Sequence, residues 1–483
     1  MLALFERLGQ GLIGGNLSIR VVQIILFPLA IGFFLREERN IGFLFAVILL
    51  FFSSPFLNYL TYMVFPDGPL LIFFLLFLYF LRKQLQEDAL GNVLGLGLTL
   101  SLMLYSKYHA ILILPFLVLA NFHLLRTRWF YQVGILAFLL FIPHLIWQYQ
   151  NEFVSFQFHL TGRSKPISLK YLPDFVGQQL GAVGPILILA ALYKSENQFE
   201  KHLKVLLVGV LIFFSLISLR GFVHIQWTSL AYFPALYLSA RYLESSKHKR
   251  RILLLVIPFL FVQLLLRLQL VAPIFPGEKI GANFVKGQKA WAHEISEVTG
   301  GSTFVYEHDL KEPSTYAFYS GLPSISFYPS ARKSSQYALW AMEDTIQNKP
   351  ALIGKKNAFE GSQLLHFKQR KLHYLKVDSF ISYQNIQCEW IEVGEGESAV
   401  KVINHRDAIL PLASDRPVIK LINEEGDRIQ IDFQSEWQDI PGHQSHTFWL
   451  SNGQSIPPGD YVISIDDGRL SPSINSSKVV IED

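Results

Sequence analysis

Long apolar runs separated by short polar breaks fill the chain from Leu17 to Val271, and this pattern constrains the fold more than any other feature. A helix needs about 20 apolar residues to cross the roughly 30 Å hydrocarbon layer of a bilayer. From Pro276 onward the charged residues return and no long apolar run occurs. The overall apolar fraction of 51% is therefore an average over two unlike parts. The pattern predicts a polytopic α-helical membrane domain over residues 1–275, followed by about 200 residues that fold in water.

The apolar runs predict about ten transmembrane helices. Their expected ranges are 18–35, 41–58, 68–81, 91–105, 108–125, 130–147, 174–193, 205–219, 225–240 and 252–272.

Lysine and arginine are distributed unevenly between the alternate loops of this arrangement. One set of loops holds 14 of them and comprises residues 36–40, 82–90, 126–128, 194–204 and 241–251. The other set holds six and comprises residues 1–17, 59–67, 106–107, 148–173 and 220–224. Cytoplasmic loops carry the excess of positive charge, so the first set is expected in the cytoplasm and the tail outside it.

The same count places the N-terminus outside as well. Met1 to Asn16 lacks a basic n-region, an apolar h-region and a small-residue cleavage site, so it does not resemble a signal peptide. An outer N-terminus without a signal sequence is hard to insert. We therefore expect either that an upstream helix is missing from this chain or that the count of spans is wrong by one.

The tail is expected to form two extracytoplasmic domains. Residues 276–385 read as α/β, with helices over 282–298 and 337–347 and strands over 302–306, 316–319, 325–328 and 351–353. Residues 386–483 show only strand signals, with alternation over 400–403, 418–421, 428–433 and 461–465 and a last strand near the C-terminus. These short strands separated by turns indicate a small β-sandwich.

Two simple features exclude other classes of protein. Cys388 is the single cysteine, so the chain has no intrachain disulfide. The net charge of +4 is small, and no basic tract is interleaved with aromatic residues, so nothing indicates a nucleic-acid partner.

Polar side chains gather at the predicted outer ends of the spans. An ionisable residue at membrane depth costs about 2.5–3.5 kcal/mol, so it needs a reason to be there. Lysine and arginine would neutralise a phosphate, and tryptophan and tyrosine would stack on a sugar or lie in the membrane interface. The set predicts a site for a membrane-anchored substrate with a headgroup, with Asp67, Lys107, Tyr108, His109, Trp147, Arg163, Gln178, Arg220 and Trp227 as candidate binding residues.

A purely structural interpretation of these residues stays open. Aromatic side chains form ordinary belts at the membrane interface, and lysine and arginine at helix ends reach the interface without any ligand. Asp67 lies between two prolines and could instead cap the amides of a helix start. His109, His144 and His159 lack the spacing of metal ligands, and no glycine-rich phosphate loop follows a strand.

Four stretches resemble the bacterial integral-membrane glycosyltransferases of the dolichyl-phosphate-mannose protein mannosyltransferase and aminoarabinose transferase type, the GT-C class. Residues 65–70 (FPDGPL) resemble the family's aspartate-proline segment, and residues 95–109 its glycine-rich helix ending in Ser-Lys-Tyr. Residues 147–163 resemble its Trp-Asn segment with Gln148 in place of the Asn, and 220–232 resemble its Arg…Asn-Trp-Pro…Tyr segment with Gln226 and Thr228 substituted. In the tail, 316–319 and 332–340 are similar to the periplasmic domain of some members, so the resemblance covers about residues 5–385.

The resemblance implies a polyprenyl-phosphate-linked sugar donor, a lipid, glycan or protein acceptor, and an inverting transfer on the outer face of the bacterial inner membrane. A carboxylate base would activate the acceptor hydroxyl, and cations would stabilise the departing phosphate. It leaves a divalent metal open as a cofactor. Family members begin with a helix and an outer loop bearing an Asp-Glu pair, and neither is present here, so no catalytic residue is assigned. A truncated reading frame or an inactive protein would explain this difference.

Three functions are compatible with the sequence. The chain is a lipid-linked-sugar glycosyltransferase, a non-catalytic homologue that binds polyprenyl phosphate or glycan, or a transporter of lipid-linked sugar. Transporters usually show internal repeats of their spans, and none is visible here.

Overall fold

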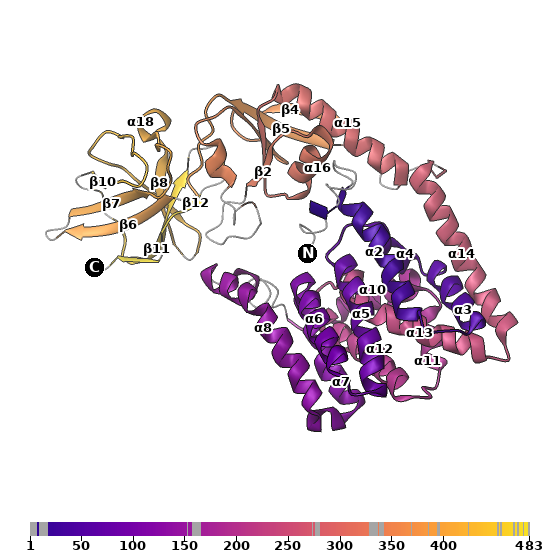
Figure 1. Ribbon diagram of the computed structural model, residues 1–483. Coiled ribbons are helices and arrows are strands. Elements are labelled where there is room, and N and C mark those ends of the chain that lie inside the picture. Colours follow the sequence, from indigo (N-terminus) through magenta and orange to yellow (C-terminus); the bar gives the residue numbers. More distant parts are fainter. Residues whose placement is uncertain are drawn as a thin grey trace. The chain divides into compact units, whose positions relative to one another are not determined.

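The protein is described by a computed structural model in which the chain forms two compact units, Met1–Pro276 and Gly277–Asp483 (Figure 1). The residues that the structure describes are 7–8, 18–151, 153–156, 166–272, 274–275, 281–327, 337, 342–368, 370–384, 386–393, 397–423, 425–451, 454, 456–466, 469–470, 473–476 and 478–481.

The first unit is built from helices joined by short connections. They are α2 (Ser18–Leu35), α3 (Ile41–Phe52), α4 (Pro55–Tyr62), α5 (Asp67–Gln86), α6 (Leu90–Ser106), η1 (Tyr108–Leu112), α7 (Ile113–Ala120), η2 (Phe122–Arg126), α8 (Arg128–Gln150), η3 (Leu169–Tyr171), α10 (Leu172–Val183), α11 (Ile186–Leu192), α12 (Gln198–Ser218), η4 (Ile225–Thr228), α13 (Ser229–Ser245) and α14 (Lys249–Val271).

The protein is a multi-pass membrane protein, but the predicted count of about ten spans is not confirmed. By length and composition, four of the described helices can cross a membrane, namely α5, α8, α12 and α14. Two bent helix pairs raise the number to six if each pair is one span. Several of the remaining expected spans correspond to apolar helices of 10–17 residues, which are shorter than a straight crossing requires.

Both bends lie where the sequence interrupts a helix. The first pair, α3 and α4, bends by 89° before Pro55, and the second, α10 and α11, bends by 94° at Gly184, next to Pro185. Proline lacks the amide hydrogen that an interior helical position needs, so it begins a new helix. Gly184 has φ +74°, and a Cβ added there would lie 3.2 Å from the carbonyl oxygen of Ser53. The two bends therefore contact each other.

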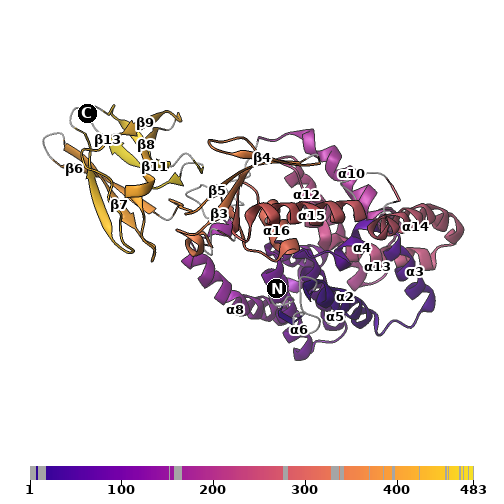
Figure 2. The same cartoon turned by 90° about the horizontal axis from the view of Figure 1, so that it is seen from above.

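Helix α5 is the centre of the unit, whereas α8 and α14 lie at its periphery. Figures 1 and 2 show α5 between these two helices. In the apolar part of α5 67% of the residues are buried, against 22% in α8 and 22% in α14. The exposed side chains of the outer helices include Ile135, Phe138, Leu254 and Phe261, which form surfaces suited to contact with lipid.

The second unit opens with an α/β region. Its sheet has the order β2-β1-β3-β5-β4, in which β1 (Thr303–Glu307), β2 (Ser324–Phe327) and β3 (Ala351–Lys355) are parallel, and β4 (Gln363–Phe367) and β5 (Arg370–Val377) are antiparallel additions. The helix α15 (Gly281–Thr299) packs Trp291 and Ile295 against Phe304 of the sheet. The expected helix over 282–298 and the strands at 302–306, 325–328 and 351–353 match these elements within two residues.

The strand expected at 316–319 is wrong, because these residues lie in helix α16 (Lys311–Ser320). Gly321 ends the helix in the left-handed conformation, with φ +71°, which is a common helix stop. Of the helix expected over 337–347, the structure describes the short η5 (Met342–Ile346), and most of the remainder lies outside the described residues.

The C-terminal part of the second unit is a β-sandwich. One sheet has the order β10-β7-β6, and the other has the order β12-β11-β8-β9 with β13 paired to β11. The strands are β6 (Ile386–Val393), β7 (Glu397–Asn404), β8 (Val418–Asn423), β9 (Arg428–Ile431), β10 (Ser445–Trp449), β11 (Gly459–Asp466), β12 (Ser473–Ile474) and β13 (Val479–Ile481), with the short helix α18 (Leu412–Asp415) before β8 (Figures 1 and 2). Val400 and Val402 of one sheet and Leu421 and Ile463 of the other share one core.

The α/β region and the sandwich are in contact within the second unit. Leu470 packs in a core with Val305 and Phe380, and Arg406 forms an ion pair of 2.8 Å with Asp344. The division of the tail into domains 276–385 and 386–483 stays a prediction.

Candidate functional site

Three polar side chains meet where helices α5, α6 and α13 have their ends. The ammonium Nζ of Lys107 lies 2.8 Å from both carboxylate oxygens of Asp67, and the Ser229 hydroxyl donates to Asp67 Oδ1 at 3.0 Å. Asp67 is only 1% exposed. It begins α5, whereas Lys107 is the C-cap of α6. A helix N-terminus favours an anion and a C-terminus favours a cation, so both helix dipoles support this pair.

The chain before α5 is shaped by close packing around Gly68. The Gln23 amide of α2 donates to the carbonyl oxygens of Leu60 and Met63, at 2.6 and 2.8 Å. A Cβ at Gly68 would overlap the Gln23 amide, so a larger residue here would displace that amide from its two hydrogen bonds. The segment around Pro66 thus places Asp67 at the start of the central helix.

A second polar group surrounds Tyr108. Its hydroxyl lies 2.6 Å from His144 Nε2 and accepts a hydrogen bond of 2.7 Å from Gln148 Nε2. The Tyr108 ring stacks on Phe156, with 5.7 Å between centroids and 9° between planes. The Trp147 ring stacks on the His144 ring, with 5.6 Å between centroids and 17° between planes.

A third polar group lies between α10 and the start of α13. Gln179 Oε1 accepts hydrogen bonds from Thr228 at 3.0 Å and from Tyr232 at 3.3 Å. All three side chains are buried. Nearby, the ring centroids of Trp227 and Phe214 are 6.1 Å apart, and the Phe214 ring also contacts His109.

Three buried polar atoms around these groups have no hydrogen-bond partner among the described residues. They are His109 Nε2, Gln148 Oε1 and Gln179 Nε2. Unpaired buried polar atoms are costly, so they mark places where a water molecule or a polar ligand group is expected.

The structure joins some of the nine predicted site residues and separates others. Asp67 and Lys107 contact each other directly. Tyr108 and His109 follow Lys107 on η1, and Trp147 and Trp227 belong to the aromatic groups just described. Gln178 is half-buried on α10, beside Gln179. Arg220 is exposed in the turn after α12, and Arg163 lies outside the described residues.

Several residues of the arrangement escaped prediction as site residues. Ser229, Gln148 and Gln179 are uncharged, so their presence near the membrane carries little cost and little signal. Gln148 could have been singled out because it replaces the Asn of the family's Trp-Asn segment. No comparable feature of the sequence singled out Ser229.

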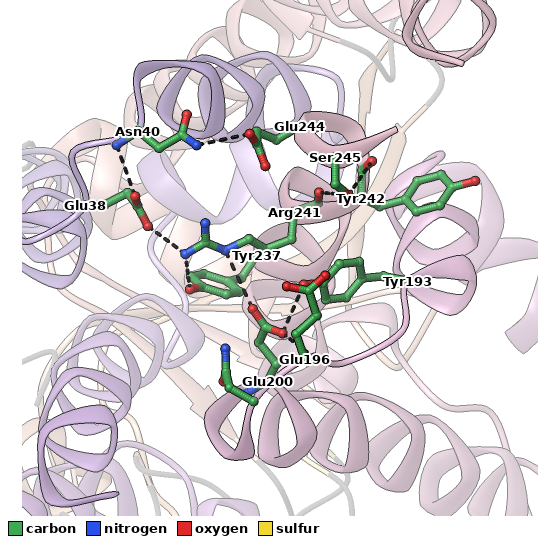
Figure 3. Close-up of polar contacts among 11 residues, drawn as sticks. Glu38, Asn40, Tyr193, Glu196, Glu200, Tyr237, Arg241, Tyr242, Glu244 and Ser245 are labelled. Atoms are coloured by element: carbon green, nitrogen blue, oxygen red, sulfur yellow. Dashed lines mark hydrogen bonds and ion pairs between the residues drawn. The ribbon is translucent and has the colours of Figure 1, made fainter. Parts of the chain in front are cut away.

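The opposite ends of the helices carry a separate charged cluster (Figure 3). Arg241 Nη2 lies 2.7 Å from Glu38 Oε2 and donates to the Tyr237 hydroxyl at 2.9 Å, while Arg241 Nε lies 3.7 Å from Glu200 Oε1. Glu200 also accepts a hydrogen bond from the Tyr193 hydroxyl at 3.0 Å. The cluster joins loop residues 36–40, 194–204 and 241–251, three of the loops predicted to share the cytoplasmic side.

No group of three or more histidine, cysteine, aspartate or glutamate side chains is placed to hold a metal ion within the described part of the chain. Nothing in the donor sets above therefore assigns a metal to the site.

Part of the chain matches a known protein family, and its fold matches solved structures. Residues 1–147 match the family model described as dolichyl-phosphate-mannose-protein mannosyltransferase. The crystal structure of ArnT from Cupriavidus metallidurans in the apo state matches with a TM-score of 0.53 and 13% sequence identity, over 77% of this chain and 86% of that one. The resemblance to this family, expected over about residues 5–385, is matched by the family model over residues 1–147. The chain has an ArnT-like fold, with helical membrane and sheet-containing parts as expected.

Two further results complete the comparison. The crystal structure of ArnT from the same organism bound to undecaprenyl phosphate matches with a TM-score of 0.48 and 10% identity, over 77% of this chain and 87% of that one. No curated protein matches the chain.

Proposed function

We propose that the chain is a membrane glycosyltransferase that transfers a sugar from a polyprenyl-phosphate-linked donor to an acceptor on the outer face of the membrane. The observation that carries the proposal is the Lys107–Asp67 pair at the helix ends of an ArnT-like fold. The match of residues 1–147 to a family that takes its name from a dolichyl-phosphate-linked sugar supports the same donor class.

Lys107 is the group that would bind the donor phosphate. An ammonium has three N–H donors, and two of them are used by the oxygens of Asp67. The third remains for a phosphate oxygen, and the side chain is 21% exposed, so it is reachable. As the sugar–phosphate bond breaks, the bridging oxygen gains negative charge, and a cation fixed in place stabilises that charge.

Asp67 serves as a positioning residue and not as the base. Both of its oxygens are engaged by Lys107, one also by Ser229, and the side chain is buried. An acceptor hydroxyl that attacks the anomeric carbon must give its proton to an accessible base. Asp67 instead holds Lys107 in one orientation, so that little entropy is lost when the phosphate binds.

The aromatic and amide groups beside Lys107 would bind the sugar. Tyr108, Trp147 and Trp227 offer ring faces, and His109 and Gln148 each have a polar atom without a hydrogen-bond partner in the described part of the chain. A saccharide has apolar C–H faces, which pack on aromatic rings, and hydroxyl groups, which form hydrogen bonds with polar atoms of this kind. Gln178, Arg163 and Arg220 stay predictions as further binding residues.

The orientation of the protein belongs to the proposal. The excess of lysine and arginine in the loops around 36–40 and 241–251 puts those loops in the cytoplasm. The Lys107 end of the helices and the second unit then lie outside, in the inner membrane of a bacterium and its periplasm.

The test is sugar transfer by the purified chain in proteoliposomes, with a polyprenyl-phosphate-linked sugar as donor. We expect Lys107→Ala to reduce transfer by at least about 100-fold, the scale of a lost charge-stabilising group. Arg220→Ala should also reduce transfer. Lys201→Ala is the matched control, because Lys201 is an exposed lysine near the opposite end of the bundle.

Three results would contradict the proposal. Unchanged transfer in Lys107→Ala would remove Lys107 from the site. Donor binding without any transfer would support the non-catalytic homologue instead, and movement of the labelled lipid between leaflets without transfer would support a transporter.

A further inference from the structure

The β-sandwich contains a cleft that the membrane site does not explain. It has a volume of about 470 Å³, within the range of small-molecule sites. The cleft lies beside β8 and β9, and the residues that matter for its chemistry are Arg416, Gln430, Asp432, Phe433, Glu436 and Trp437.

The loop that forms one wall of the cleft is fixed at both ends. The backbone N–H of Gln434 donates to the backbone carbonyl of Trp449 at 2.9 Å. Leu410 and Ile440 exchange two backbone hydrogen bonds of 2.9 and 3.0 Å. The opposite wall is tied to the same loop, because the amide of Ala413 donates to Asp439 Oδ1 at 2.9 Å. The cleft is thus formed before any ligand binds, which lowers the entropy cost of binding.

An aromatic platform lines the cleft. Trp437 is half-buried, and its ring packs on Phe448 and Phe433 with centroid distances of 4.7 and 5.4 Å. These contacts anchor the indole in the sandwich core while part of its surface stays accessible. A rigid aromatic side chain of this kind supplies contact area at little entropic cost.

Polar groups of both signs surround the platform. The side chains of Arg416 and Glu436 are exposed and make no hydrogen bond or ion pair with any described residue. Asp432 accepts a hydrogen bond of 3.2 Å from the Gln430 amide, which orients its carboxylate. With one guanidinium and two carboxylates, the lining of the cleft has a net charge of about −1 at neutral pH.

This combination selects one class of ligand. An anion would be repelled by the two carboxylates, and a purely apolar ligand would cover charged side chains without offering them any hydrogen bond. A neutral saccharide places a C–H face on the indole, while its hydroxyls donate to the carboxylates and accept from the guanidinium. We propose that the cleft beside β8 and β9 binds a neutral saccharide, independently of the activity of the membrane unit.

The test measures binding of neutral gluco-, manno- and galacto-configured tetrasaccharides to the full chain in lipid nanodiscs, by saturation-transfer NMR and equilibrium dialysis. Trp437→Ala should weaken binding by at least about tenfold, as expected for an aromatic anchor. Arg416→Ala and Glu436→Ala should also weaken it, and both change exposed side chains, so the fold is retained. Trp449→Ala, an exposed tryptophan outside the cleft, should leave binding unchanged.

The outcomes separate this proposal from the one for the membrane site. Loss of saccharide binding in the cleft variants, with membrane-site activity intact, supports the proposal. It is overturned if no tetrasaccharide binds, if an anionic sugar binds in preference, or if Trp449→Ala weakens binding as much as Trp437→Ala. Failure of sugar transfer alone would leave saccharide binding unaffected.

Discussion

Asp67 and Lys107 are two opposite charges in a largely buried position, and each is compensated chiefly by the other. Removing one partner leaves an uncompensated charge, whereas replacing both by neutral groups of similar volume costs far less. We therefore expect Lys107→Ala to reduce the free energy of unfolding by about 3–5 kcal/mol. The double variant Asp67→Asn/Lys107→Met should recover most of that loss, as measured by thermal unfolding in nanodiscs. Equal unfolding temperatures for the single variant and the wild type would show that the pair contributes nothing.

Glu343 predicts a pH dependence in the second unit. Burial raises the pKa of Glu343 to about 7 from its ordinary value of 4.5, against the lowering effect of Arg406, while Asp344 adds to the rise. Between these two values the unfolded chain has released the proton and the folded chain has kept it. The fold should therefore lose up to about 3 kcal/mol as the pH rises from about 4.5 through 7.

The control for this pH effect is Glu343→Gln, which has no proton to lose. Hydrogen exchange of peptides from η5 and β7 should show protection that falls with rising pH in the wild type and stays level in the variant, after correction for intrinsic rates. Equal pH profiles for the two proteins would contradict the role of Glu343.

The sequence indicated single candidate residues better than their contacts. The cost of a charge at membrane depth was enough to single out Asp67 and Lys107. Their pairing could not be predicted, because they are 40 residues apart and Lys107 has no acidic neighbour in the sequence. Ser229 stayed hidden, since a serine at a helix end has no comparable cost.

At the scale of the helix and strand, hydropathy located the elements but not their shapes. An apolar run such as 41–58 has the composition of one span, and its total hydropathy does not reveal the 89° bend before Pro55. Residues 316–319 were likewise expected to form a strand, although Gly321 marked the end of a helix. In the sandwich, period-two alternation located β7, β8, β9 and β11, because one face of each sheet is buried, but it did not locate β6 and β10.

Helix α13 links the two ends of the membrane unit. It carries Ser229 at its start and Arg241 twelve residues later, a rise of about 18 Å. The Arg241 side chain is 24% exposed and that of its partner Glu200 is 3% exposed. The free energy that this ion pair contributes to folding should therefore lie between the values for exposed and for buried pairs. Arg241→Ala should reduce the free energy of unfolding by about 2–3 kcal/mol.

The matched control for Arg241 is Arg251→Ala. Arg251 is exposed on α14 and makes no ion pair with the described residues. Its replacement should change thermal unfolding in nanodiscs by less than about 0.5 kcal/mol. If both variants unfold alike, the cluster in Figure 3 does not hold the helix ends together.

At the scale of the whole molecule, the orientation in the membrane can be mapped with introduced cysteines. The native Cys388 is buried, and burial raises the pKa of its thiol, so it should not react with a membrane-impermeant maleimide. On intact cells, Ser414→Cys in the second unit should be labelled and Lys247→Cys should be labelled only after the membrane is opened. Labelling of both residues from the same side would contradict the proposed topology.

The donor site is tested most directly by the binding of a polyprenyl phosphate to the chain in nanodiscs, measured by native mass spectrometry. We predict binding to the wild type, no comparable binding of the parent polyprenol, and at least about tenfold weaker phosphate binding by the folded Asp67→Asn/Lys107→Met variant. Equal binding of polyprenyl phosphate by the wild type and this variant would contradict the account.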